Sequence, residues 1–272
     1  MKYKLVISDY DGTLGGAPLN TIDDETLSAI KKFQDKGGKF VVCTGRMFSS
    51  AQRICKSANL GGLCVSFQGA MIKDIESGNP LLEGGLTPKE SAEVALKFVR
   101  DDTLALAYIG EKLYYQPNEK YAEYIKIYAS ALKTEVYAVP DLAKEILSQN
   151  KMVSKMCALC EPEKVNSLME KYNGEYNKTD VMFNSGAKYL LECINKKYNK
   201  GEAVKFLATH YNIPLTEVLT VGDSTNDIPL LCGEWHGVAV GDASEKVKSI
   251  AKEVTVDFKD KPVKYLLEKY CL

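Results

Sequence analysis

The 272-residue sequence has almost no excess of either charge, because 35 lysines and arginines are balanced by 36 aspartates and glutamates. The basic residues are spread along the chain and form no stripe of the kind that nucleic-acid binding requires. Long apolar runs are also missing, and the run Leu5 to Ile7 near the N-terminus is far shorter than a signal or membrane segment. We therefore expect a cytoplasmic protein that binds neither nucleic acid nor a membrane.

Histidine is scarce as well, since the chain has only His210 and His236, and neither has a carboxylate or cysteine partner at ligand spacing. The eight cysteines lie mostly within apolar runs. The single C-x-x-C pair, Cys157 and Cys160, has no second pair that would complete a zinc site. We expect free, buried thiols in a chain whose composition, 45% hydrophobic and 26% charged, is that of an ordinary folded protein.

The first 80 residues alternate apolar runs (3–8, 39–43, 63–67) with helical patterns (23–35, 48–58). This βαβαβ order predicts a parallel sheet covered by helices. Residues 87–194 predict a second α/β unit, and the first pattern resumes at residue 199. We predict an α/β fold: a Rossmann-like, doubly wound parallel-sheet core of residues 1–83 and 195–272, with an inserted α/β domain of residues 84–194 that begins at a hinge, Gly84-Gly85.

Three apolar runs of the predicted core end in polar clusters, which read SDYDGT, CTGR and GDSTND. In open α/β sheets the ligand crevice lies beyond the carboxyl ends of the strands, so these clusters can meet at one site. Asp9, Asp11, Asp223 and Asp227 would repel one another there unless a cation compensated their charge. Carboxylates, carbonyls and water are the ligands that Mg²⁺ prefers. We therefore predict a Mg²⁺ site and, because this ion binds phosphoryl oxygens, a phosphate-bearing substrate.

The same clusters, together with NKGEAV around Lys200, resemble in order the four motifs of the haloacid dehalogenase superfamily of phosphatases. The large insertion resembles the α/β cap of the Cof-type sugar-phosphate phosphatase subgroup, and SFQGAMI and GVAVGDASEKVK are similar to that subgroup's flanking segments. The resemblance covers essentially the whole chain. It departs at Gln68 and at Asp242, where the subgroup commonly has asparagine, and these departures concern substrate preference more than reaction type.

The resemblance implies that Asp9 is the nucleophile that attacks phosphorus and forms an aspartyl-phosphate. It implies that Asp11 is the general acid for the leaving alcohol and then the general base for water. The Asp9 side chain, the Asp11 backbone carbonyl and Asp223 would hold Mg²⁺. Asp227 would complete the metal site, either as a ligand through water or as a partner of Lys200.

The resemblance also implies a phosphate-binding set of four residues, Thr44, Gly45, Lys200 and Asn226. Thr44 would donate a hydrogen bond to the transferring phosphoryl group, and Lys200 would supply positive charge. The role of Lys200 rests on the resemblance alone, since nothing in its local sequence distinguishes it from other lysines. For Arg46 we expect a structural salt bridge, and for Trp235 a packing role.

Taken one at a time, these clusters could be ordinary turns and helix caps, because Asp, Ser, Thr and Asn favour such positions. Their joint occurrence favours a Mg²⁺-dependent phosphomonoester hydrolase that acts on small phosphorylated metabolites such as sugar phosphates, as a monomer or homodimer. The alternatives are a phosphomutase of the same superfamily, a phosphoacceptor module similar to response-regulator receivers, and a metabolite-binding protein without activity.

Overall fold

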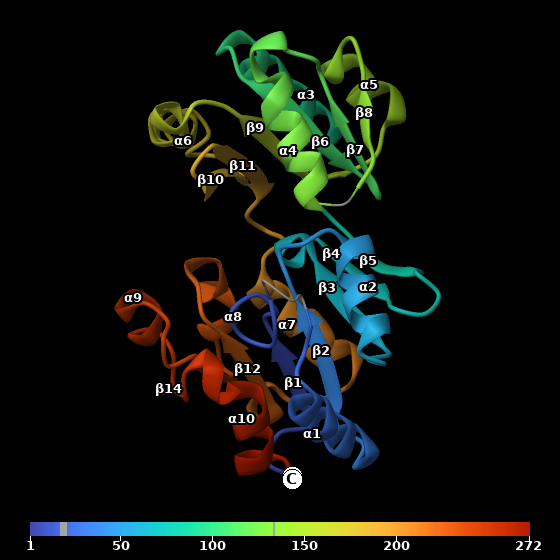
Figure 1. The fold of residues 1–272 in the computed structure, drawn as a ribbon, viewed down its shortest axis with the longest axis vertical. Coiled ribbons are helices and arrows are strands. Elements are labelled where there is room, and N and C mark those ends of the chain that lie inside the picture. The colour runs from blue at the N-terminus through green and yellow to red at the C-terminus, as the bar shows by residue number, and fades with distance from the viewer. Residues whose placement is uncertain (17–20, 133) are drawn as a thin grey trace. The chain divides into compact units, whose positions relative to one another are not determined.

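The computed structural model describes residues 1–16, 21–132 and 134–272. The chain forms two compact units, coloured in sequence order in Figure 1. The first unit comprises Met1–Leu82 and Asn199–Leu272, and the second comprises Glu83–Tyr198. The sequence predicts the two boundaries after residues 83 and 194. The second lies four residues later in the structure, because the last strand of the inserted unit runs to Asn195.

The first unit is built on an eight-stranded sheet with the order β14-β13-β12-β1-β2-β3-β4-β5. Its strands are β1 (Leu5–Ser8), β2 (Lys39–Cys43), β3 (Leu63–Ser66), β4 (Met71–Asp74), β5 (Pro80–Glu83), β12 (Val218–Gly222), β13 (His236–Ala239) and β14 (Glu253–Val254). Neighbouring strands from β14 to β3 pair in parallel, and β4 pairs antiparallel with β3. The predicted parallel-sheet core is confirmed.

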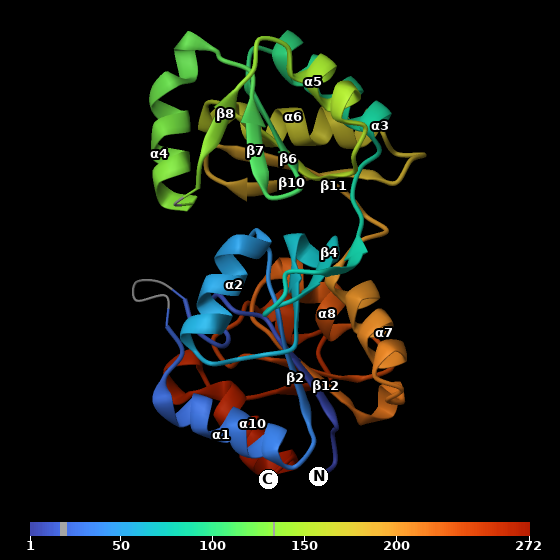
Figure 2. The same cartoon turned by 90° about the vertical axis from the view of Figure 1, so that its right-hand side faces the viewer.

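Helices cover both faces of this sheet (Figure 2). They are α1 (Asp24–Asp35), α2 (Phe48–Ser57) and α10 (Pro262–Tyr270) on one face, and α7 (Lys200–His210) and α8 (Ile228–Leu231) on the other. The core lies between α7 and the sheet, where Val204 and Leu207 pack with Leu5 and Ile7. Trp235 is buried in the same cluster, as expected. Helix α9 spans Glu245–Lys248.

The second unit contains a six-stranded sheet with the order β10-β11-β9-β6-β7-β8. Its strands are β6 (Leu104–Ile109), β7 (Lys112–Tyr115), β8 (Val136–Ala138), β9 (Val153–Leu159), β10 (Val181–Ala187) and β11 (Leu190–Asn195). Its helices are α3 (Pro88–Arg100), α4 (Ala122–Leu132), α5 (Leu142–Gln149) and α6 (Pro162–Glu175). All pairs except the parallel β7–β8 pair are antiparallel, so this unit has an α/β composition without a parallel core.

The predicted hinge at Gly84-Gly85 is a place of close packing within the second unit. A side-chain carbon on Gly84 would lie 2.3 Å from the Tyr198 ring, and one on Gly85 would lie 2.2 Å from the Val153 carbonyl oxygen. These glycines therefore allow the chain to pass close to its neighbours. The eight cysteines are all free, and all except Cys232 are buried. Among the described residues, no helix has the length and apolar character needed to cross a membrane.

Candidate active site

Three adjacent strands of the first unit end in the residues that the sequence singles out. Asp9 follows β1, Thr44 follows β2 and Asp223 follows β12, and these strands are parallel neighbours in the order β12-β1-β2. The Asp9 N–H donates to the Val221 carbonyl oxygen at 2.9 Å, so the hydrogen bonds between β1 and β12 continue to Asp9. The three clusters consequently lie at one edge of the sheet, as the topology requires.

A buried lysine joins two of the predicted aspartates. Lys200, the first residue of α7, places its Nζ 2.5 Å from Asp9 Oδ1 and 2.6 Å from Asp227 Oδ1. The side chains of Lys200 and Asp227 are fully buried, and that of Asp9 is 7% exposed. Charges buried in this way are stable only when they are paired, so the three side chains form one structural unit. The resemblance implies that Asp227 is either a metal ligand through water or a partner of Lys200, and the structure contains the pairing with Lys200.

Asp227 also organises the loop that follows β12. Its Oδ2 accepts the backbone N–H groups of Asp223 at 3.1 Å and Ser224 at 3.0 Å. Asp223 is half-buried, and its Oδ1 accepts the Thr13 hydroxyl at 2.7 Å. Gly12 has φ of +82°, and a side-chain carbon there would lie 2.7 Å from Asp223 Oδ2. Glycine is therefore required between Asp11 and Thr13 for Asp223 to approach β1.

Asp11 does not join the acidic group, because its carboxylate is engaged by Arg46. Arg46 Nε donates to Asp11 Oδ2 at 2.8 Å and Nη2 donates to Asp11 Oδ1 at 2.6 Å. The sequence predicts a structural salt bridge for Arg46, and the structure contains a salt bridge whose partner is Asp11. The pair arises because β1 and β2 are adjacent, which brings the residues that follow each strand together.

The remaining predicted residues occupy different surroundings. Thr44 is buried, and its Oγ1 accepts the backbone N–H of Arg46 at 3.2 Å. Gly45 lies against the Gln68 side chain, since a side-chain carbon on Gly45 would lie 2.4 Å from Gln68 Nε2. Asn226 is exposed, and its Oδ1 accepts the Ser224 hydroxyl. Phosphate binding by these residues stays a prediction.

The acidic group carries more negative charge than Lys200 neutralises. Burial raises the pKa of the Asp9 carboxyl to about 7, because loss of solvation and the nearby carboxylates outweigh the attraction of Lys200. Burial likewise raises the pKa of Asp223 to about 6, although the hydrogen bond from Thr13 acts in the opposite direction. Burial acts to lower the pKa of Lys200, but the attraction of Asp227 and Asp9 holds it above its ordinary value.

Three carboxylates of this group are close enough to hold a metal ion. One oxygen atom from each of Asp9, Asp223 and Asp227 lies within 4.8 Å of the others. Carboxylate oxygens are the ligand type that suits Mg²⁺, and surplus negative charge favours binding of a divalent cation. Both oxygens of Asp227 already accept hydrogen bonds from the protein, so Asp9 and Asp223 are the residues best able to contact an ion directly. The donor set fits Mg²⁺.

These pKa shifts predict how the stability of the metal-free protein depends on pH. The folded states of Asp9 and Asp223 bind protons more tightly than the unfolded chain, whose aspartates titrate near about 3.9. Their contribution is therefore complete below about pH 4 and is lost as pH rises through 6 to 7. In EDTA, we expect the melting temperature to fall from pH 5 to pH 8, and added Mg²⁺ to raise it most at pH 8.

Thermal melting of the wild type and Asp9→Asn at matched pH values measures this effect. The variant removes one of the two titrating groups and is expected to show a shallower fall. An equal fall in both proteins would contradict the role given to Asp9.

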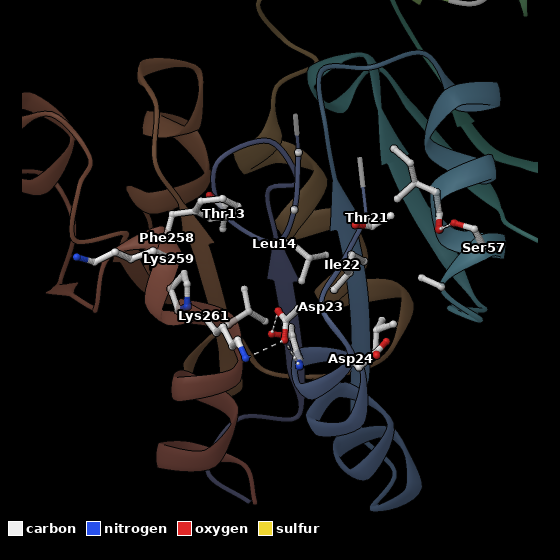
Figure 3. Close-up of a pocket in the computed structure, with 18 residues that line it drawn as sticks. Thr13, Leu14, Thr21, Ile22, Asp23, Asp24, Ser57, Phe258, Lys259 and Lys261 are labelled. Atoms are coloured by element: carbon white, nitrogen blue, oxygen red, sulfur yellow. Dashed lines mark hydrogen bonds and ion pairs between the residues drawn. The ribbon is translucent and has the colours of Figure 1, made fainter. Parts of the chain in front are cut away.

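A separate cavity of about 780 Å³ lies beside the acidic group and is lined by residues of the N-terminal segment, α1, α2 and the segment before α10 (Figure 3). Thr13 lines this cavity and also donates to Asp223. Lys261, which precedes α10, points toward Asp23, which precedes α1, and Lys261 Nζ lies 3.6 Å from Asp23 Oδ1. Among the described lining residues, none is a predicted catalytic or metal-binding residue.

A family model described as haloacid dehalogenase-like hydrolase matches residues 6–267, which is nearly the whole chain. The chain belongs to this family. The expected family and the expected fold class are both confirmed.

Known proteins resemble the chain over most of their lengths. Phosphatase YwpJ of Bacillus subtilis is 26% identical, covering 97% of this chain and 99% of the relative. An HMP-PP phosphatase of Serratia proteamaculans is 26% identical, covering 93% and 89%. A crystal structure of a Thermotoga maritima protein is 27% identical, with a TM-score of 0.83 and coverage of 98% and 97%.

Two residues of the site have no catalytic or metal-binding role predicted from the sequence. Thr13, which holds Asp223, lies in the SDYDGT cluster, where threonine is also an ordinary turn residue. Arg46, which holds Asp11, lies in the CTGR cluster that the sequence does single out. Its position directly after two predicted phosphate-binding residues was a signal that it could belong to the site.

Proposed function

We propose that this chain is a Mg²⁺-dependent phosphomonoester hydrolase that acts on small phosphorylated metabolites such as sugar phosphates. That it is a phosphatase follows from its membership of the haloacid dehalogenase-like hydrolases and from relatives named as phosphatases. The observation that carries the finer proposal is the buried group of Asp9, Lys200 and Asp227 beside Asp223 at the ends of adjacent strands. The assignment of residues 84–194 as a cap domain stays a prediction.

In the first step, an Asp9 carboxylate oxygen attacks phosphorus and forms the P–O bond of an aspartyl-phosphate. The bond between phosphorus and the ester oxygen breaks, and protonated Asp11 gives its proton to that oxygen, so the alcohol leaves neutral. Lys200 holds one Asp9 oxygen at 2.5 Å and orients the carboxylate for the attack. Burial favours this role, since a carboxylate with few surrounding waters is a stronger nucleophile.

In the second step, Asp11 accepts a proton from water while the water oxygen attacks phosphorus. The bond between phosphorus and Asp9 breaks, which regenerates the Asp9 carboxylate and releases inorganic phosphate. We infer that Thr44 assists both steps. Its oxygen accepts the Arg46 N–H, which leaves the hydroxyl hydrogen available to donate to a phosphoryl oxygen.

The proposed ion would be held by Asp9 and Asp223, and it would supply positive charge that reduces the repulsion between Asp9 and an anionic phosphoryl group. Asp227 would act through its neighbours, because it fixes Lys200 and the backbone that carries Asp223. A phosphomutase would share these steps, but it would pass the phosphoryl group to a sugar hydroxyl. Release of inorganic phosphate distinguishes the two reactions.

The proposal is tested by assaying the purified protein against p-nitrophenyl phosphate and a panel of sugar phosphates, nucleotides, pyridoxal phosphate and flavin mononucleotide. We expect broad, modest release of inorganic phosphate that requires Mg²⁺ and is abolished by EDTA. Activity that returns when Mg²⁺ is added back shows that the loss is caused by metal removal. Full activity in EDTA would contradict the metal requirement, and transfer without phosphate release would favour the mutase.

A further inference from the structure

We propose that Arg46 is a positioning residue that fixes the orientation of the Asp11 carboxylate, an inference that rests on the proposed phosphatase function. The two side chains form a bidentate pair, with N···O distances of 2.8 and 2.6 Å. Pairs of this geometry are directional, because the planar guanidinium matches the plane of the carboxylate. Arg46 is not among the residues to which the four motifs assign a role in the sequence.

Asp11 benefits from such a partner because burial does not fix its side chain. Its side chain is 47% exposed and lies on the loop after β1, whereas the Asp9 side chain is buried beside Lys200. A general acid must stay within hydrogen-bond reach of the leaving oxygen, and a misplacement of about 1 Å can be costly. The bidentate pair uses one lone pair on each carboxylate oxygen, so the second position on one oxygen can carry the proton that Asp11 gives to the leaving alcohol and can later accept a proton from water.

Arg46 is itself held firmly in place. Its guanidinium carbon lies 5.0 Å from the centre of the Tyr10 ring, and Tyr10 is fully buried. Its backbone N–H donates to Thr44 Oγ1, and its carbonyl oxygen accepts the Phe67 N–H at 3.0 Å. A guanidinium stacked on a buried ring loses little further freedom when it binds a carboxylate.

The segment that supports Arg46 is strained. Phe67 and Gln68 have φ of +49° and +60°, which is the left-handed region that bulky residues rarely adopt. The Gln68 N–H donates to the Thr44 carbonyl oxygen at 3.1 Å, so this segment holds the backbone on both sides of Gly45. Strain of this kind persists only where the surrounding structure imposes it, and it is concentrated at functional sites. Here it fixes the backbone from which the Arg46 side chain extends.

The inference is tested with Arg46→Met, which keeps the length of the side chain and removes the fork of donors. Phenyl phosphate and p-nitrophenyl phosphate are similar in size, but phenolate needs a proton from a general acid far more than p-nitrophenolate does. We expect kcat/KM for phenyl phosphate to fall about tenfold or more, part of the about 10²- to 10⁴-fold that a general acid supplies. We expect kcat/KM for p-nitrophenyl phosphate to fall less than about threefold.

A double-mutant cycle with Asp11→Asn separates positioning from direct contact with the phosphoryl group. If Arg46 acts through Asp11, adding Arg46→Met to Asp11→Asn changes kcat/KM by less than about twofold. A further loss of about tenfold on both esters would mean that Arg46 contacts the phosphoryl group itself, and it would overturn the inference. Wild-type selectivity in Arg46→Met would overturn it as well.

Controls keep these outcomes distinguishable from a folding defect and from failure of the proposed function. Arg53→Met changes an exposed arginine on α2 and is expected to match the wild type. Arg46→Lys keeps the positive charge with a single donor group, so we expect it to recover part of the lost kcat/KM for phenyl phosphate. If thermal melting shows that Arg46→Met is unfolded, Arg46→Lys takes its place in the double-mutant cycle. A wild type that hydrolyses neither ester with Mg²⁺ would refute the proposed function, whereas an active wild type with an unaffected Arg46→Met refutes this inference alone.

Discussion

Asp9→Asn is expected to reduce the turnover of p-nitrophenyl phosphate by at least about 10³-fold, because removal of a covalent nucleophile leaves only binding and charge stabilisation. The amide has the same shape as the carboxylate, and its oxygen can still accept the hydrogen bond from Lys200. The variant is therefore expected to fold. Steady-state release of phosphate measures the loss, and mass spectrometry after acid quenching detects the phosphorylated protein, which only the wild type should form.

A matched control for this substitution is Asp35→Asn on α1. Asp35 is an exposed aspartate whose partner is Lys31, four residues earlier on the same helix. Exposed pairs of this kind contribute little, so the control is expected to keep wild-type activity and stability. Asp9→Asn with wild-type turnover, or with a phosphorylated species equal to that of the wild type, would refute the nucleophile assignment.

Lys200→Met is expected to be the most destabilising of the proposed single substitutions. Its ammonium lies between Asp9 and Asp227, at 2.5 and 2.6 Å, with no exposure to solvent. Removing one partner of a buried ion pair costs about 3–5 kcal/mol, because it leaves buried charge without compensation. For a chain of this size, that corresponds to a fall in melting temperature of about 10 °C, measured by thermal unfolding in EDTA. Turnover should be lost as well.

The double variant Lys200→Met with Asp227→Asn tests the physical reason for this loss. It removes one positive and one negative charge, so the remaining Asp9 no longer has a buried carboxylate beside it. We expect the melting temperature to recover part of the difference while activity stays low. If Lys200→Met melts like the wild type, the carboxylates do not depend on this lysine, and its assignment as the cation of the site is wrong.

The parts of the site that could be predicted from the sequence are those that follow directly from strand order. Asp9, Thr44 and Asp223 each come immediately after an apolar run, and parallel strands bring such positions to one edge of the sheet. Lys200 was found only through the family resemblance. Its importance is evident once α7 packs on the sheet, because its helix begins at the point where Nζ reaches both carboxylates.

The parts that could not be predicted depend on contacts between segments. The pair of Arg46 and Asp11 requires a particular orientation of two loops, and no local pattern reveals which of many carboxylates an arginine binds. The hinge at Gly84-Gly85 stays a prediction. Glycine signals either freedom or close approach, and the close approach of the Tyr198 ring and the Val153 carbonyl depends on contacts between segments.

The position of β1 has a consequence for how the protein is synthesised. β1 pairs with β2 on one side and with β12 on the other, and the Thr13–Asp223 hydrogen bond beside it joins residues 210 positions apart. While the ribosome is still making the inserted unit, one edge of β1 has no partner strand, and such edges promote aggregation of nascent chains. The acidic group is incomplete until Lys200, Asp223 and Asp227 have been made, so catalysis can begin only after these residues have emerged.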